Sequence, residues 1–142
     1  MPAVYEKMGI RFLYPENWTL DESAALEGER SVSVHSPGGG FWSLSLHEPE
    51  TDPRELASAA LEALEAEYQD SESEPIDQQL AGQTIEGYDV NFFYLDFTNT
   101  AWIRTFRAPN ASCLVLCQAE DRELAALGPV FNAITTSVLS AV

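Results

Sequence analysis

The segment that decides the fold runs from Tyr88 to Ala119 and reads YDVNFFYLDFTNTAWIRTFRAPNASCLVLCQA. It contains three stretches rich in aromatic and β-branched residues, a composition typical of β-strands, at 88–97, 100–107 and 112–119. A short polar turn at Thr98 and Asn99 separates the first two stretches, and the sequence APNA separates the last two. Because parallel strands need much longer connections, the segment predicts a three-stranded antiparallel meander.

The first of these stretches is strongly apolar from Phe92 to Phe97. A strand without regular polar alternation is typical of a sheet position where both faces are covered. We therefore expect this strand to lie centrally in the sheet, and we expect another strand before it at 76–82.

The N-terminal third predicts more strands of the same sheet. The sequence IRFLY, residues 10–14, reads as a strand that ends at Pro15. The sequence SVSVHSPGGGFWSLSLHE then alternates apolar and polar residues on both sides of a Pro-Gly-rich loop, which predicts a β-hairpin. If residues 36–40 form the loop, two pairs face each other across the strands: Val34 with Trp42, and Val32 with Leu44.

Two segments predict amphipathic helices. In TDPRELASAALEALEAEYQ, residues 51–69, Asp52 is an N-cap, Pro53 occupies the first helical position and Glu55 completes a capping box. Its apolar face comprises Leu56, Ala60, Leu61, Leu64 and Tyr68. In EDRELAALGPVFNAITTSVL, residues 120–139, apolar residues recur at helical spacing, and Gly128-Pro129 predicts a kink or a restart.

Together these elements predict one domain spanning 1–142, because 142 residues suffice for a single core. The order is three strands, a helix, about four strands and a second helix. The predicted fold class is α+β, with an antiparallel sheet of about six to seven strands flanked by two main helices.

The chain carries 23 acidic and 7 basic residues, for a formal net charge of −16. Duplex nucleic acid and anionic membranes would repel such a surface, so we expect neither nucleic-acid binding nor membrane insertion. The chain holds no signal-like apolar segment, and we expect a cytoplasmic protein. Acid is concentrated at 48–77; we interpret this as a solvated face, with a basic partner or divalent cations as the alternative.

Nothing in the sequence assembles a catalytic or metal-binding motif. Cys113 and Cys117 would lie about 13 Å apart on one strand and read as buried thiols rather than a disulfide. The histidines His35 and His47 have no companion ligands at a recognisable spacing. We therefore expect no catalytic residue, no metal, no cofactor and no enzyme activity.

Several motifs resemble the PsbP and Mog-one-like family: FLYPENW near the start, GQTIEGYDVNFFY, CLVLCQA, and FNAITTSV in the terminal helix. The resemblance spans nearly the whole chain. It implies an α/β/α layered domain built on an antiparallel sheet, and a family of binding and assembly modules rather than enzymes.

One group of residues is a candidate partner-binding site. The sequence AWIRTFR places Trp102 and Arg104 on the same strand face, with Arg107 near the strand end, and aromatic residues with arginine are enriched in interaction hot spots. The alternative is that Trp102 fills the core and the arginines offset nearby acids. We assign a core role to Trp18, which follows Tyr14-Pro15.

The sequence thus predicts a non-enzymatic protein-interaction or assembly module whose partner is another protein, with the oligomeric state left open. One alternative is a small-ligand carrier or enzyme with a pocket between sheet and helix, lined by Trp42 or Trp102. A second alternative is a chaperone-like groove that binds a partner's helix.

Overall fold

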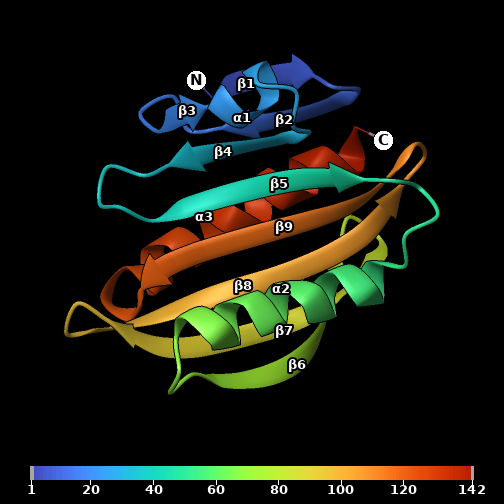
Figure 1. Cartoon of the computed structure of the whole chain (residues 1–142). Coiled ribbons are helices and arrows are strands. Elements are labelled where there is room, and N and C mark those ends of the chain that lie inside the picture. Colours follow the sequence, from blue (N-terminus) through green and yellow to red (C-terminus); the bar gives the residue numbers. More distant parts are fainter. Residues whose placement is uncertain (1, 142) are drawn as a thin grey trace.

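A computed structural model describes residues 2–141. Its centre is a seven-stranded antiparallel sheet (Figure 1) with the spatial order β3 (Thr19–Asp21), β4 (Ser31–His35), β5 (Phe41–His47), β9 (Ala111–Glu120), β8 (Phe97–Ala108), β7 (Gln83–Tyr94) and β6 (Glu72–Leu80). A separate antiparallel hairpin is formed by β1 (Ala3–Lys7) and β2 (Ile10–Tyr14). The helices are α1 (Ser23–Leu26), α2 (Pro53–Glu67) and α3 (Asp121–Ser140). The predicted α+β class is confirmed, while β1, β3 and α1 were not predicted. The strand predicted at residues 10–14 forms as β2, but the expectation that it belongs to the main sheet is wrong, because β2 pairs with β1.

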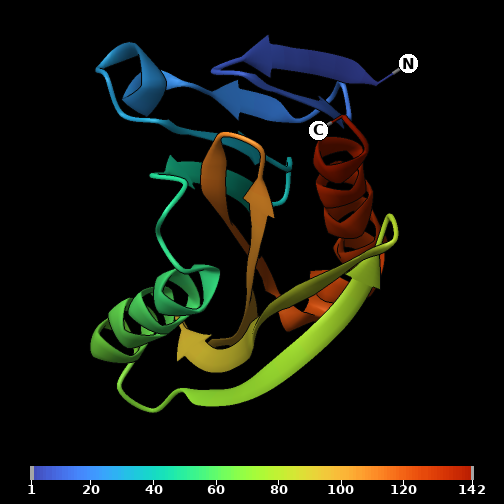
Figure 2. The same cartoon turned by 90° about the vertical axis from the view of Figure 1, so that its right-hand side faces the viewer.

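The two long helices lie on opposite faces of the sheet (Figure 2). Each helix covers a separate apolar cluster, so the sheet has one interior on each side. Strands β8 and β9 contribute to both interiors because successive side chains point to opposite faces. On β9, for example, Val115 belongs to the α3 side while Leu116 packs on the α2 side.

The interior beneath α3 is built around Trp42, which is fully buried. Its ring lies 4.8 Å from that of Phe12, which joins the β1–β2 hairpin to the sheet. Its indole Nε1 donates a hydrogen bond of 2.9 Å to Thr135 Oγ1 on α3, so the buried polar atom of the ring is satisfied. Trp18 also lies here, 8% exposed and edge-on to Phe131, and its predicted core position is confirmed.

The interior beneath α2 is smaller. Buried side chains of the sheet, such as Val90 and Ile103, meet Ala57 and Leu64 from the helix. The helix begins as predicted, because the Asp52 carboxylate accepts a hydrogen bond from the Arg54 backbone N–H and proline occupies the first helical position.

The predicted hairpin register is confirmed: Val34 pairs with Trp42, and Val32 pairs with Leu44. The terminal helix also forms, and Pro129 lies inside one continuous α3 rather than at a break. Within residues 2–141, no helix combines the length and the apolar character that crossing a membrane requires.

The prediction for the apolar stretch from Phe92 to Phe97 is wrong in two respects. The turn between β7 and β8 lies at Leu95 and Asp96, because Tyr94 pairs with Phe97 and Asn99 already lies within β8. The stretch therefore runs out to the end of a hairpin, where most of its large side chains are exposed instead of covered on both faces.

Candidate protein-docking site

Four large apolar side chains are exposed together at the turn between β7 and β8. They are Phe93 (69% exposed), Tyr94 (49%), Leu95 (73%) and Phe97 (42%), and we call them the apolar tip. Tyr94 and Phe97 are cross-strand partners on one face of the hairpin, while Phe93 points to the other face, so the four side chains surround the turn. Single exposed apolar residues are common on protein surfaces, whereas a group of them indicates a candidate interaction site.

The backbone of the apolar tip adopts a conformation that its sequence does not favour. Leu95 and Asp96 both have positive φ, at 51° and 67°, as a two-residue type I′ hairpin turn requires. The other two such turns within residues 2–141 carry Met8 and Ala81 at the first position, with φ of 57° and 49°, and glycine at the second position, where Asp96 stands here. A leucine in this region costs about 1–2 kcal/mol, so the tip holds an exposed leucine at an energetic expense.

The surroundings of the apolar tip are charged. The guanidinium of Arg122 lies 4.4 Å from the ring centroid of Phe97 and is also paired with Glu120. Asp96 forms the turn itself. The tip is therefore a group of exposed apolar side chains with charged neighbours, a combination also found in protein interfaces.

A pocket of about 450 Å³ lies beside the tip, at the C-terminal end of α2; we call it the Tyr68 pocket. Its wall includes Glu67, Tyr68, Asp70, Phe92, Tyr94 and Leu95. The Tyr68 ring stacks on Phe92, with centroids 4.0 Å apart, and meets Tyr94 at an angle of 81°. Burial, and secondly the Glu67 carboxylate, raises the pKa of Tyr68, so its phenol stays neutral at physiological pH.

The structure separates the three residues that the sequence nominated for partner binding. Trp102 and Arg104 do share a face of β8, with the guanidinium carbon 5.0 Å from the indole centroid. However, Arg104 is only 5% exposed and Trp102 is partly buried. Arg107 is exposed, an odd number of residues away, and donates to the Pro49 carbonyl oxygen. Partner binding by these residues stays a prediction, and they do not form one exposed patch.

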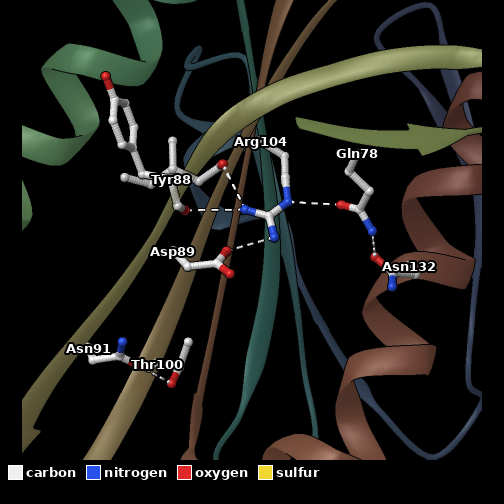
Figure 3. A network of polar contacts seen from close by, with 8 residues as sticks. Gln78, Tyr88, Asp89, Asn91, Thr100, Arg104 and Asn132 are labelled. Atoms are coloured by element: carbon white, nitrogen blue, oxygen red, sulfur yellow. Dashed lines mark hydrogen bonds and ion pairs between the residues drawn. The ribbon is translucent and has the colours of Figure 1, made fainter. Parts of the chain in front are cut away.

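Arg104 is held by a polar network that joins three strands and α3 (Figure 3). Its guanidinium donates to Asp89 Oδ1 at 2.8 Å, to Gln78 Oε1 at 3.0 Å, and to the carbonyl oxygens of Tyr88 and Ile103. The Gln78 amide donates in turn to Asn132 Oδ1 on α3 at 3.0 Å. The partners match the donors of the guanidinium, so this buried charge is structural in character.

Strands β7 and β8 approach each other closely at the same place. Gly87 on β7 pairs with Arg104, and a Cβ atom added at Gly87 would lie 1.7 Å from the Ile103 carbonyl oxygen. Only glycine fits this close approach of two strands.

A second concavity lies on the other side of the molecule, between the end of β2 and α3. This groove of about 620 Å³ has an almost entirely apolar lining that includes Leu13, Tyr14, Pro129, Val130 and Ile134. The sequence suggested a ligand pocket lined by Trp42 or Trp102, but neither residue lines this groove.

The two cysteines are buried and free, and each lies on the α3 side of β9. Burial raises the pKa of Cys113 to about 11 and raises that of Cys117 further. Both groups are therefore neutral thiols that pack in the core.

Sequence reasoning missed the apolar tip and the Tyr68 pocket. The available signal was the pair Leu95-Asp96 between two apolar runs, since aspartate favours left-handed turn positions. The polar stretch at Thr98 and Asn99 looked like the better turn, and the aromatic residues before it looked like core.

No family model and no curated protein matches the chain in sequence. Solved structures match its fold over nearly its whole length. A Pseudomonas aeruginosa protein of unknown function, PA94, described as a putative regulator, has a TM-score of 0.60 at 10% identity and covers 96% of this chain and 94% of its own. Cyanobacterial PsbP from Synechocystis sp. PCC 6803 has a TM-score of 0.58 at 14% identity, covering 96% and 90%.

The Ran-binding protein Mog1p of Saccharomyces cerevisiae has a TM-score of 0.56 at 13% identity and covers 99% of this chain and 92% of its own. The chain therefore has the fold of PsbP and Mog1, as the sequence motifs predicted. A fold alone does not specify what a protein binds, so the site of this chain has to be argued from its own residues.

Proposed function

We propose that this chain is a non-enzymatic protein-interaction module that docks its partner on the apolar tip. The observation that carries the proposal is the exposure of Phe93, Tyr94, Leu95 and Phe97 around one turn. Aromatic anchors contribute much of the binding energy of protein interfaces. Support from the fold is coarser: one protein of the same fold, Mog1p, is a Ran-binding protein.

In the test, three forms of the full chain are immobilised on a resin and incubated with lysate of the native host. The first is wild type, the second is the double variant Phe93→Ser with Leu95→Ser, and the third is Leu26→Ser. Leu26 is a matched control because it is 76% exposed in the short helix α1, outside the tip. Identification of retained proteins by mass spectrometry gives the readout.

We expect at least one protein to be retained by wild type and by Leu26→Ser, and to be depleted about tenfold or more by the tip variant. The thermal midpoint of the tip variant should not fall, since both altered side chains are exposed. Equal retention by all three forms would contradict the proposal.

The groove beside α3 favours a second candidate, a carrier of a small apolar ligand. Its volume lies within the range of ligand pockets, and its lining is apolar. The same groove is the surface that a chaperone-like role would use for a partner helix. Native mass spectrometry of the purified chain distinguishes a carrier from a chaperone-like protein, because a bound small molecule adds a discrete mass. Ala133 lines the groove and is exposed, so replacing it with tryptophan should fill the groove and remove that mass.

A further inference from the structure

The Tyr68 pocket has aromatic walls set at a steep angle to each other. The rings of Tyr68 and Tyr94 have centroids 5.9 Å apart and an interplanar angle of 81°. Phe92 stacks on the Tyr68 ring and is itself buried, so the position of Tyr68 is fixed by packing. Aromatic ring faces carry negative electrostatic potential and attract cations.

The same pocket is negatively charged. Glu67 and Asp70 line it, while the described lining includes no lysine or arginine. It also lies at the C-terminal end of α2, where the helix dipole places partial negative charge. Helices commonly carry a basic residue there, but the last turn of α2, all of it within the described chain, has none. Aromatic faces, two carboxylates and a helix C-terminus all favour a positively charged occupant.

The pocket is continuous with the apolar tip. Phe93, Tyr94 and Leu95 belong to the tip and also line the pocket, so a partner that covers the tip reaches the pocket as well. The net charge of −16 favours a basic partner by long-range attraction. We propose that the Tyr68 pocket receives a lysine side chain of the protein that docks on the apolar tip; this inference rests on the proposed function.

The first experiment measures the pocket without the partner. The full chain is titrated with n-butylammonium, which reproduces the end of a lysine side chain, and with neutral 1-butanol, while NMR follows the ring signals of Tyr68 and Tyr94. We expect butylammonium to shift both rings in a saturable way that weakens with added salt, and 1-butanol to bind about tenfold more weakly or less. Equal shifts from both compounds would overturn the inference, because the pocket would then be only apolar.

Variants separate the contributions of ring and charge. Tyr94→Leu keeps apolar volume but removes a ring face, and the double variant Glu67→Gln with Asp70→Asn removes both carboxylates. The matched control is Glu65→Gln, which removes one exposed charge from the same helix outside the pocket lining. We expect the first two to weaken butylammonium binding several-fold and the control to leave it unchanged. Equal weakening by the Glu65→Gln control would overturn the inference, because binding would then depend only on the overall negative charge of the chain.

A final comparison distinguishes this inference from the proposed function. If tip variants lose the partner, the proposed function stands, and Glu67→Gln with Asp70→Asn should then weaken that same partner; unchanged partner binding overturns the lysine assignment alone. If tip variants keep the partner, the proposed function fails and the lysine assignment fails with it, even where butylammonium still binds. A last titration uses choline. If choline binds about tenfold more tightly than butylammonium, the occupant is a free quaternary ammonium ion and the lysine assignment is overturned.

Discussion

Arg104 on β8 donates a hydrogen bond of 2.8 Å to Asp89 on the neighbouring strand β7, at a position where the arginine is 5% exposed. The pair is one contact of a network that includes Gln78 and reaches Asn132 on α3. A buried guanidinium is tolerated only with such partners, so the two strands and the helix depend on one another at this point.

Replacing Arg104 with alanine should lower the free energy of unfolding by about 1–3 kcal/mol, because Gln78 and the Tyr88 carbonyl oxygen lose a donor, while Asp89 is partly exposed and can be hydrated. Urea denaturation measures the change. Arg107→Ala is the control, since Arg107 is exposed, and it should stay within about 0.5 kcal/mol of wild type. Wild-type stability of Arg104→Ala would contradict the structural role of the network.

Replacing Leu95 with asparagine should stabilise the chain while it weakens partner binding. Asparagine tolerates the left-handed backbone at φ 51° far better than leucine, so we expect a gain of about 0.5–1 kcal/mol. The midpoint of urea denaturation should rise with an unchanged slope. A variant that loses stability would show that the exposed leucine contributes to folding rather than to docking.

Trp18→Ala should lower the free energy of unfolding by about 3–5 kcal/mol, because the ring is 8% exposed and packs edge-on against Phe131. Calorimetry measures the loss, and Trp18→Phe, which keeps most of the apolar contact, should cost less. Equal stability of wild type and the alanine variant would exclude a core role for this side chain.

Cys113 and Cys117 should resist alkylation by iodoacetamide in the folded chain from pH 7 to pH 9, as read by mass spectrometry. Burial holds the pKa of Cys113 at about 11, so its reactive thiolate is scarce throughout that range. In the unfolded chain the thiol ionises near its ordinary value of 9.0, so stability should fall as the pH rises above 9 toward 11. Rapid labelling without denaturant would contradict the burial of both thiols.

The parts of the fold that depend on local pattern could be predicted from the sequence. The register of Val34 with Trp42 follows from period-two alternation around one loop, and the start of α2 follows from Asp52 and Pro53. In both cases the residues that specify the structure lie within a few positions of the element that they form.

Two features were missed for different reasons: the burial of Arg104 depends on distant parts of the chain, whereas the apolar tip depends on an unusual local turn. Arg104 is hydrogen-bonded to Gln78 on β6, which in turn donates to Asn132 on α3, and no short-range sequence pattern indicates these contacts. Leu95 occupies a turn position that leucine rarely takes, so propensity placed the turn three residues too late. The sequence correctly predicted that Trp102 and Arg104 share one face of a strand. It did not show that this is the face that α3 covers.

Strands β8 and β9 supply side chains to both apolar interiors, one beneath each long helix. Neither interior can open without disturbing the ladder that the other depends on, so the two layers should melt together. Amide hydrogens in the β8–β9 ladder, such as those around Ile103 and Leu116, should then exchange with deuterium only through opening of the entire molecule.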